Sequence, residues 1–154
     1  MGAGILPVVL FRGITYFMLA READTGLWCD FGGSHVKGET RFKTAIREAY
    51  EETDGFLGDM YELRDRVHKN YINTITTSDQ GYKTYLFRMN YYESKNFINC
   101  FNNHRKFVVE NELIIPKEGL FEKSEVKLFN KKNIILHNDE IRPFYREITN
   151  NLII

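Results

Sequence analysis

The segment Gly33–Thr53, GSHVKGETRFKTAIREAYEET, constrains the fold of this chain more than any other stretch. From Thr40 onward, small and apolar residues recur at the spacing of one helical face. They are Phe42, Ala45, Ile46, Ala49 and Thr53. Thr40 is suited to cap the helix, and Gly55 is suited to end it. The segment therefore predicts a helix with one buried side.

The other side of this helix gathers three carboxylates, Glu48, Glu51 and Glu52, at positions i, i+3 and i+4. Like charges at this spacing destabilise a helix by about 0.2–0.5 kcal/mol per pair. The helix dipole also disfavours anions near the C-terminus. Arg47 would offset part of this repulsion, and a divalent cation would offset much more, because Mg²⁺ and Mn²⁺ prefer hard oxygen ligands. The alternative is an ordinary solvated acidic face.

A glycine-rich loop in front of the helix favours the metal interpretation. Gly32, Gly33 and Gly38 allow a close approach of the backbone and offer N–H groups to anions.

The spacing of the glycine, arginine and glutamate residues in this segment resembles the signature of the Nudix hydrolases: Gly, five residues, Glu, seven residues, Arg-Glu, an aliphatic residue, any residue, Glu-Glu. The matching residues are Gly33, Glu39, Arg47, Glu48, Ala49, Tyr50, Glu51 and Glu52. The signature then expects a glycine one position before Gly55. Either Asp54 adopts a left-handed turn, or the helix runs one residue longer and Gly55 caps it.

The resemblance implies an α+β fold, namely an α/β/α sandwich around a mixed central sheet. It implies a pyrophosphohydrolase that cleaves a phosphoanhydride bond in a nucleoside diphosphate linked to another moiety, with Mg²⁺ or Mn²⁺ as cofactor. Glu48, Glu51 and Glu52 are the expected metal ligands. Glu52 is also a candidate general base, and Glu125 stands where the family often has a further acidic residue, with Glu122 as its rival.

Further candidates surround this core. Arg47 is expected to orient Glu39 or Glu51 through a bidentate fork. The candidate substrate-binding residues are Gly32, Gly33, Glu39, Trp28, Arg12 and Lys37. Trp28 would stack on a base or nicotinamide ring, and the two basic residues would contact phosphates. A core role for Trp28 and a solvated role for Arg12 and Lys37 are the alternatives.

The substrate class stays open at this level. No dense basic cluster is apparent, which favours a small nucleotide over capped mRNA or a diphosphoinositol polyphosphate. A third alternative is a non-catalytic, nucleotide-binding regulator with a Nudix-like fold.

The rest of the chain predicts strands mixed with helices. Strands are expected at 5–11, 14–19, 62–76, 81–90 and 124–134, a short extended piece at 27–33, and helices at 92–109 and 138–152. The 154 residues fit a single domain, 1–154.

The composition narrows the setting and the partners. The 21 basic residues balance the 21 acidic ones, so net charge gives no attraction to nucleic acid or membranes. No apolar run reaches the about 18 residues that a membrane span needs. Two lone cysteines do not suggest a disulfide framework, and we expect a reducing, cytoplasmic setting. A homodimer is left open, with 92–109 as a candidate interface.

Overall fold

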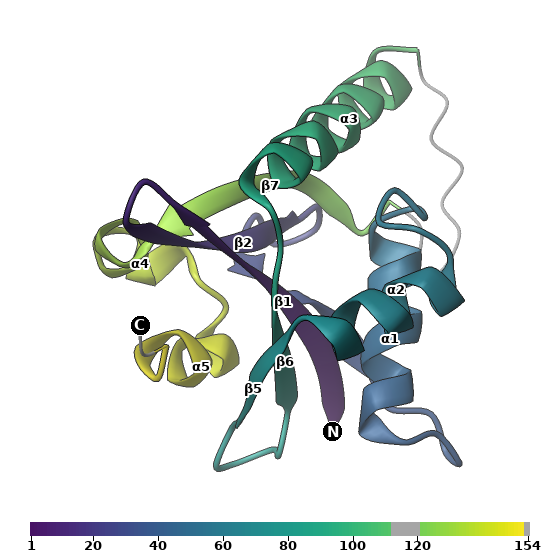
Figure 1. Cartoon of the computed structure of the whole chain (residues 1–154), viewed down its shortest axis with the longest axis vertical. Helices are drawn as coiled ribbons and strands as arrows, with labels where there is room; N and C mark the ends of the chain where they lie inside the picture. Colours follow the sequence, from purple (N-terminus) through teal and green to yellow (C-terminus); the bar gives the residue numbers. More distant parts are fainter. Residues whose placement is uncertain (112–120, 153–154) are drawn as a thin grey trace.

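The computed structural model describes residues 1–111 and 121–152. A seven-stranded mixed sheet forms its centre, and helices cover both faces (Figure 1). The strands are β1 (Gly2–Phe11), β2 (Ile14–Glu22), β3 (Trp28–Cys29), β4 (Phe31–Ser34), β5 (Tyr71–Thr76), β6 (Lys83–Arg88) and β7 (Lys123–Asn130). The helices are α1 (Arg41–Glu52), α2 (Met60–Lys69), α3 (Tyr91–Glu110), α4 (Lys131–Leu136) and α5 (Arg146–Asn150). This is the predicted α/β/α sandwich.

Strand β1 lies in the middle of the sheet, whose main path runs β3-β2-β1-β6-β5. It pairs antiparallel with β2 and parallel with β6, and its eight buried residues in a row suit a strand covered on both faces. Its first half also pairs with β4, from Gly2↔Ser34 to Ile5↔Phe31, and β7 pairs with β2. The short β4 therefore carries the double glycine to the end of the sheet where β1 begins.

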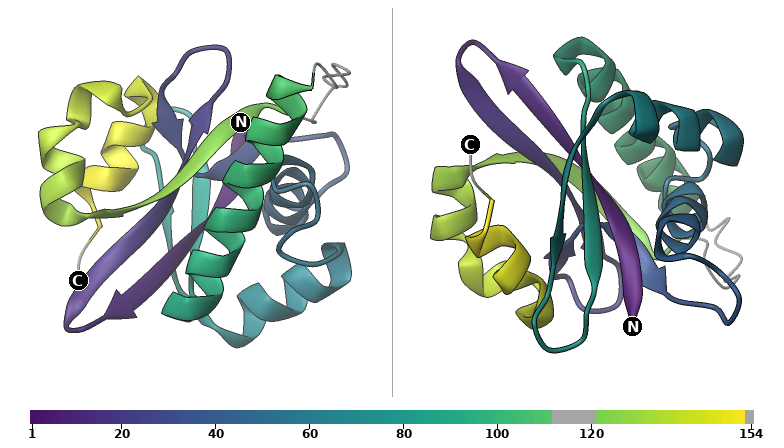
Figure 2. Two further views of the ribbon diagram at one scale, coloured as in Figure 1. Left: turned by 90° about the horizontal axis from the view of Figure 1, so that it is seen from above. Right: turned by 60° about the horizontal axis from the view of Figure 1, so that its bottom comes forward.

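Two apolar clusters hold the layers together, one on each face of the sheet. The first contains Ala45 of α1, Leu63 of α2 and Phe101 of α3. The second joins the sheet to the C-terminal helices through residues such as Phe129 and Tyr145. Figure 2 shows α1, α2 and α3 on one side and α4 and α5 on the other.

The hairpin and the acidic helix form as predicted. β1 and β2 meet at the turn Arg12-Gly13, and the hydroxyl of Thr40 accepts a hydrogen bond from the backbone N–H of Lys43 at 3.1 Å. Helix α1 ends at Glu52, and Asp54 adopts a left-handed conformation with φ of 52°. Of the two alternatives for this turn, the first is therefore correct.

The strand predicted at 62–76 is wrong in its first half, where helix α2 forms. The Asp59 carboxylate accepts a hydrogen bond from the backbone N–H of Glu62 at 2.8 Å, and the Glu62 carboxylate accepts one from the backbone N–H of Asp59 at 3.3 Å. This capping box starts the helix. Leu63 and Val67, one turn apart, are its buried face. Only Tyr71–Thr76 is the predicted strand.

Two boundaries near the C-terminus also differ from the prediction. The strand predicted at 124–134 stops at Asn130, because the side chain of Asn130 caps α4 by accepting from the backbone N–H of Asn133 at 2.8 Å. The helix predicted at 138–152 is divided into 3₁₀ turns at Asn138–Glu140 and Pro143–Tyr145 and the short α5. Pro143 has no N–H to continue a helix. The helix predicted at 92–109 is α3.

No helix in the described part of the chain is long and apolar enough to cross a membrane.

Candidate active site

Helix α1 packs over β1 and β4, which brings its acidic turns onto the double glycine. The backbone N–H of Gly32 donates a hydrogen bond to Oε2 of Glu52 at 3.1 Å. A Cβ atom on Gly33 would overlap the carboxyl group of Glu48. A residue with a side chain at Gly33 would therefore displace this carboxylate, which explains why the loop needs glycine at the point of closest approach.

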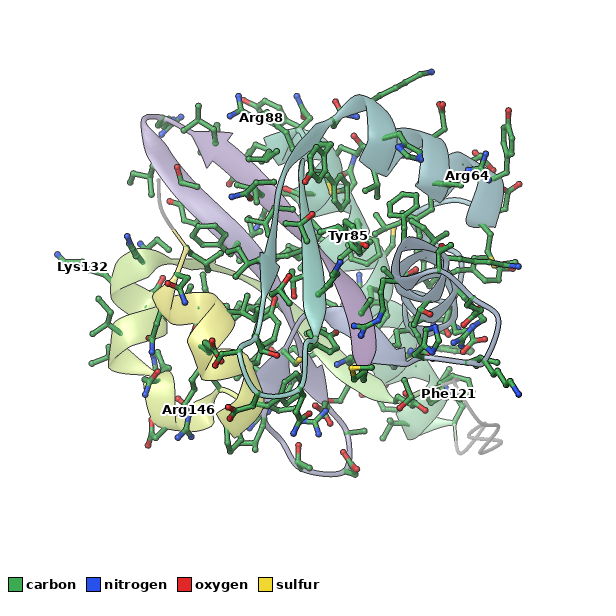
Figure 3. All side chains as sticks on the ribbon, turned by 90° about the horizontal axis from the view of Figure 1, so that it is seen from below. Arg64, Tyr85, Arg88, Phe121, Lys132 and Arg146 are labelled. Carbon is green, nitrogen blue, oxygen red and sulfur yellow. The ribbon has the colours of Figure 1, made fainter. Side chains whose placement is uncertain are left out.

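A cavity of about 690 Å³ opens beside these carboxylates, and Gly32 and Gly33 form part of its wall. The acidic side chains that line its described part are Glu22, Asp24, Glu48, Glu52 and Glu122. The basic ones are Lys123 and Arg142, and the aromatic ones are Tyr82, Phe121 and Phe144. Phe121, which is labelled in Figure 3, lies just before β7 and lines the cavity. The cavity is therefore at the N-terminal end of β7. Acidic side chains outnumber basic ones there, which favours a cationic ligand.

The three predicted metal ligands are not equally placed. At about 100° per residue, Glu52 lies nearest the buried face of α1 and Glu51 lies farthest from it. Glu52 is accordingly 2% exposed, and burial raises its pKa well above the ordinary value. Glu48 also lines the cavity, with a pKa raised by burial, whereas Glu51 is 35% exposed at its side chain and lies outside the lining. A simple solvated acidic face does not describe Glu48 and Glu52.

Arg47 ties the glycine loop to the acidic helix. Its Nε and Nη2 donate to the two carboxylate oxygens of Glu39 at 2.9 and 3.0 Å, which is a bidentate pair. Its Nη1 donates to Glu48 at 2.7 Å, and its Nη2 donates to the backbone carbonyl of Ser34 at 3.1 Å. Hydrogen bonds from Arg47 lower the pKa of Glu39 to about 2. The structure thus gives Arg47 the contacts of an orienting residue for Glu39 and Glu48.

Two buried ionisable residues next to the cavity, Asp30 and Lys123, were not predicted from the sequence. Asp30 accepts hydrogen bonds from the hydroxyls of Tyr82 and Thr84 at 2.7 and 2.8 Å, and burial raises its pKa. The ammonium group of Lys123 lies 3.7 Å from Oε2 of Glu52. The available signal for Asp30 was an acidic residue inside an otherwise apolar run, LWCDFGG; Lys123 had no local signal.

Four predicted site residues lie elsewhere, and none of them lines the cavity. Trp28 is buried, and its ring packs against Phe129 in the second apolar cluster. Arg12 occupies the turn between β1 and β2, and Lys37 is exposed in the loop before α1. Glu125 lies 3.7 Å from Arg21 on β2, away from the glycine pair.

The carboxylate oxygens at this site suit a hard divalent cation, although they make hydrogen bonds to other groups of the protein in this structure. Within residues 1–111 and 121–152, no group of three or more His, Cys, Asp or Glu side chains has the arrangement of a metal site. Glu48 is held by Arg47, and Glu52 is held by Gly32. Both nevertheless present carboxylate oxygens at one cavity over a bare glycine, and oxygen donors of this kind are what Mg²⁺ and Mn²⁺ bind.

No protein-family model and no curated protein matches the sequence. Solved structures do match it. An Ap4A hydrolase from C. elegans is similar with a TM-score of 0.57 and 16% identity, over 97% of this chain and 91% of that one. RenU, a Nudix hydrolase from M. smegmatis, is similar with a TM-score of 0.53 and 16% identity, over 98% of this chain and 86% of that one.

A bifunctional NMN adenylyltransferase/ADP ribose pyrophosphatase from Francisella tularensis gives a TM-score of 0.55 and 17% identity. The match covers 96% of this chain but only 39% of that larger protein. At sequence identities this low, the similarity shows a shared fold and does not show a shared activity. The sheet order, the two helical layers and these likenesses together show that the chain has the fold of the Nudix hydrolases.

Proposed function

We propose that the protein is a Nudix-type pyrophosphohydrolase. It would hydrolyse a phosphoanhydride bond in a nucleoside diphosphate linked to another moiety. One observation carries this proposal: Glu48 and Glu52 line a single cavity together with the glycine pair that their helix packs against. The Nudix fold supports it, because the similar solved structures include hydrolases and a pyrophosphatase.

The proposed cofactor is Mg²⁺ or Mn²⁺, with Glu48, Glu51 and Glu52 as its ligands. A divalent cation bound there would neutralise phosphate charge and lower the pKa of an attacking water. Glu48 is the best placed of the three, because it is both in the cavity wall and fixed by Arg47. The similar structure from Francisella tularensis was determined with AMP and a manganese ion, which supports the choice of cation.

The remaining roles follow from position. Arg47 would orient Glu48 and hold the loop through Glu39. Gly32 would fix Glu52, and a carboxylate that also ligates a metal ion is a weaker general base than one that does not. Of the two other candidate bases, Glu122 lines the cavity and Glu125 does not, so we assign this role to Glu122.

The cavity supports a small nucleotide as substrate. Its volume of about 690 Å³ lies in the range of ordinary ligand pockets. Tyr82 and Phe144 line it and offer aromatic surface, a role first expected of Trp28. Lys123 and Arg142 are the only basic side chains in its described lining, too few for a densely phosphorylated inositol.

A hydrolysis panel tests the proposal. Purified protein with Mg²⁺ or Mn²⁺ should release a nucleoside monophosphate from one member of a panel headed by Ap4A and ADP-ribose. Glu48→Gln should lose roughly 100-fold in kcat/KM, because the substitution removes a ligand charge. Glu110→Gln, an exposed change on α3, is the matched control and should keep full activity.

The panel also separates the alternatives. Faster release of a capped nucleotide from RNA, or of phosphate from a diphosphoinositol polyphosphate, would assign the substrate class differently. Nucleotide binding without turnover in either cation would instead indicate a regulator. Full activity of Glu48→Gln would reject the proposed site.

A further inference from the structure

Lys123 is a buried cation at the centre of the candidate site. It is the first residue of β7, where it pairs with Glu22 of β2, and its side chain is 3% exposed. It lines the cavity beside Gly32, Gly33 and Glu48. A buried ammonium group needs close acidic partners, because burial alone strongly disfavours its charge.

Three acids surround Lys123, and they come from the junction of β3 and β4, from β2 and from α1. Asp30 already accepts hydrogen bonds from Tyr82 and Thr84. Glu22 lies 2.9 Å from the guanidinium of Arg142. Glu52 has the backbone N–H of Gly32 as its hydrogen-bond donor, and Lys123 is the cation beside it. The Cys29 thiol faces the same group and donates towards Asp30.

We propose that Lys123 is a built-in cation that competes with one divalent ion for Glu52. The inference rests on the proposed function, because it concerns the same metal-binding carboxylates. Glu52 can ligate a metal ion only by sharing its carboxylate with an ammonium group 3.7 Å away or by turning from it. Lys123 belongs to the chain, so it lies beside Glu52 whether or not a metal ion is bound. Glu48 is then the main ligand of the ion, and Lys123 weakens the binding that involves Glu52.

Titration of Mn²⁺ into the protein, followed by calorimetry, tests this role without measuring activity. Lys123→Met removes the charge while keeping an unbranched side chain, and it should bind Mn²⁺ roughly tenfold more tightly than wild type. Lys123→Arg keeps the charge and should bind like wild type. Lys127→Met is the matched control, because Lys127 is exposed on the same strand, and it should change nothing.

The variant with methionine is expected to be less stable, and this gives a second measurement. Circular dichroism with and without Mn²⁺ should show that the ion raises the melting temperature of Lys123→Met more than that of wild type, because the ion replaces the lost charge. A variant that stays unfolded at saturating Mn²⁺ would overturn the inference and leave Lys123 a purely structural residue.

The outcomes separate this inference from the proposed function. If wild type binds Mn²⁺ and Lys123→Met binds it no more tightly than Lys127→Met, only the inference is rejected. If no form of the protein binds Mn²⁺, the metal site and the inference are rejected together. Binding that appears only in Lys123→Met would support the inference in its strongest form.

Discussion

Replacing Arg47 by lysine separates the contribution of the guanidinium hydrogen bonds from the contribution of the positive charge. Arg47 donates four hydrogen bonds, two to Glu39, one to Glu48 and one to the backbone of Ser34. A lysine ammonium is a single point charge and cannot reach both oxygens of Glu39 and the other two acceptors from one position. The substitution should therefore keep the net charge and lose about three of these contacts.

The magnitude follows from the partial exposure of the contacts. The Arg47 side chain is 24% exposed, so we take about 1 kcal/mol for each lost bond, below the usual range for charged partners. Arg47→Lys should lower the free energy of unfolding by about 3 kcal/mol. Arg66→Lys is the control, because Arg66 forms an exposed ion pair with Glu93 and should lose under about 0.5 kcal/mol.

Urea unfolding at pH 7, followed by circular dichroism, measures both variants. A double-mutant cycle of Arg47→Lys with Glu39→Gln would assign the coupling to this pair. A loss below about 1 kcal/mol in Arg47→Lys, or a coupling near zero, would refute the view that Arg47 fixes the loop to the helix.

In Gly33→Ala, the added Cβ should displace the Glu48 carboxylate and weaken Mn²⁺ binding about tenfold by calorimetry; unchanged affinity would contradict the close approach. Asp59→Ala removes the capping box of α2 and should lower the free energy of unfolding in urea by about 1 kcal/mol, and no loss would count against the cap. The pKa of Glu39 is lowered by Arg47 from 4.5 to about 2, so the stability from this pair is present above pH 4.5 and is lost as the pH falls through 2. In Glu39→Gln, the free energy of unfolding should not show this loss between pH 4.5 and 2. If wild type and Glu39→Gln lose the same stability over this pH range, the pair does not contribute as described.

The sequence was informative where local pattern decides structure. Helix α1 has an N-cap, a regular apolar face and a turn at Asp54, and all of these lie in one continuous segment, 40–54. Helix α2 was missed because only Leu63 and Val67 form its buried face, and the β-branched residues that follow favour a strand. Its capping residue, Asp59, was the local signal that marked the helix start.

From the sequence alone, only the part of the candidate site on helix α1 and on the glycine-rich segment before it could be predicted. Glu48 and Arg47 come close to the glycine pair through β4 and α1, which follow each other in the chain, so spacing along the sequence is informative there. Lys123 and Arg142 reach the cavity from distant segments. The pairing of β7 with β2 places Lys123, and a backbone hydrogen bond to Trp28 places Arg142; no local pattern encodes either contact. Trp28 was expected at the site because it is close to the glycine pair in the sequence, but its ring packs in the second apolar cluster.

Anomalous diffraction from a crystal grown with Mn²⁺ would locate the metal ion itself. We expect a manganese peak in the cavity beside Gly33, with a carboxylate oxygen of Glu48 within roughly 2.5 Å of it. A map with no peak at Glu48, or with manganese bound only at other acidic groups, would contradict the claim that helix α1 and its glycine loop form a metal-binding catalytic site.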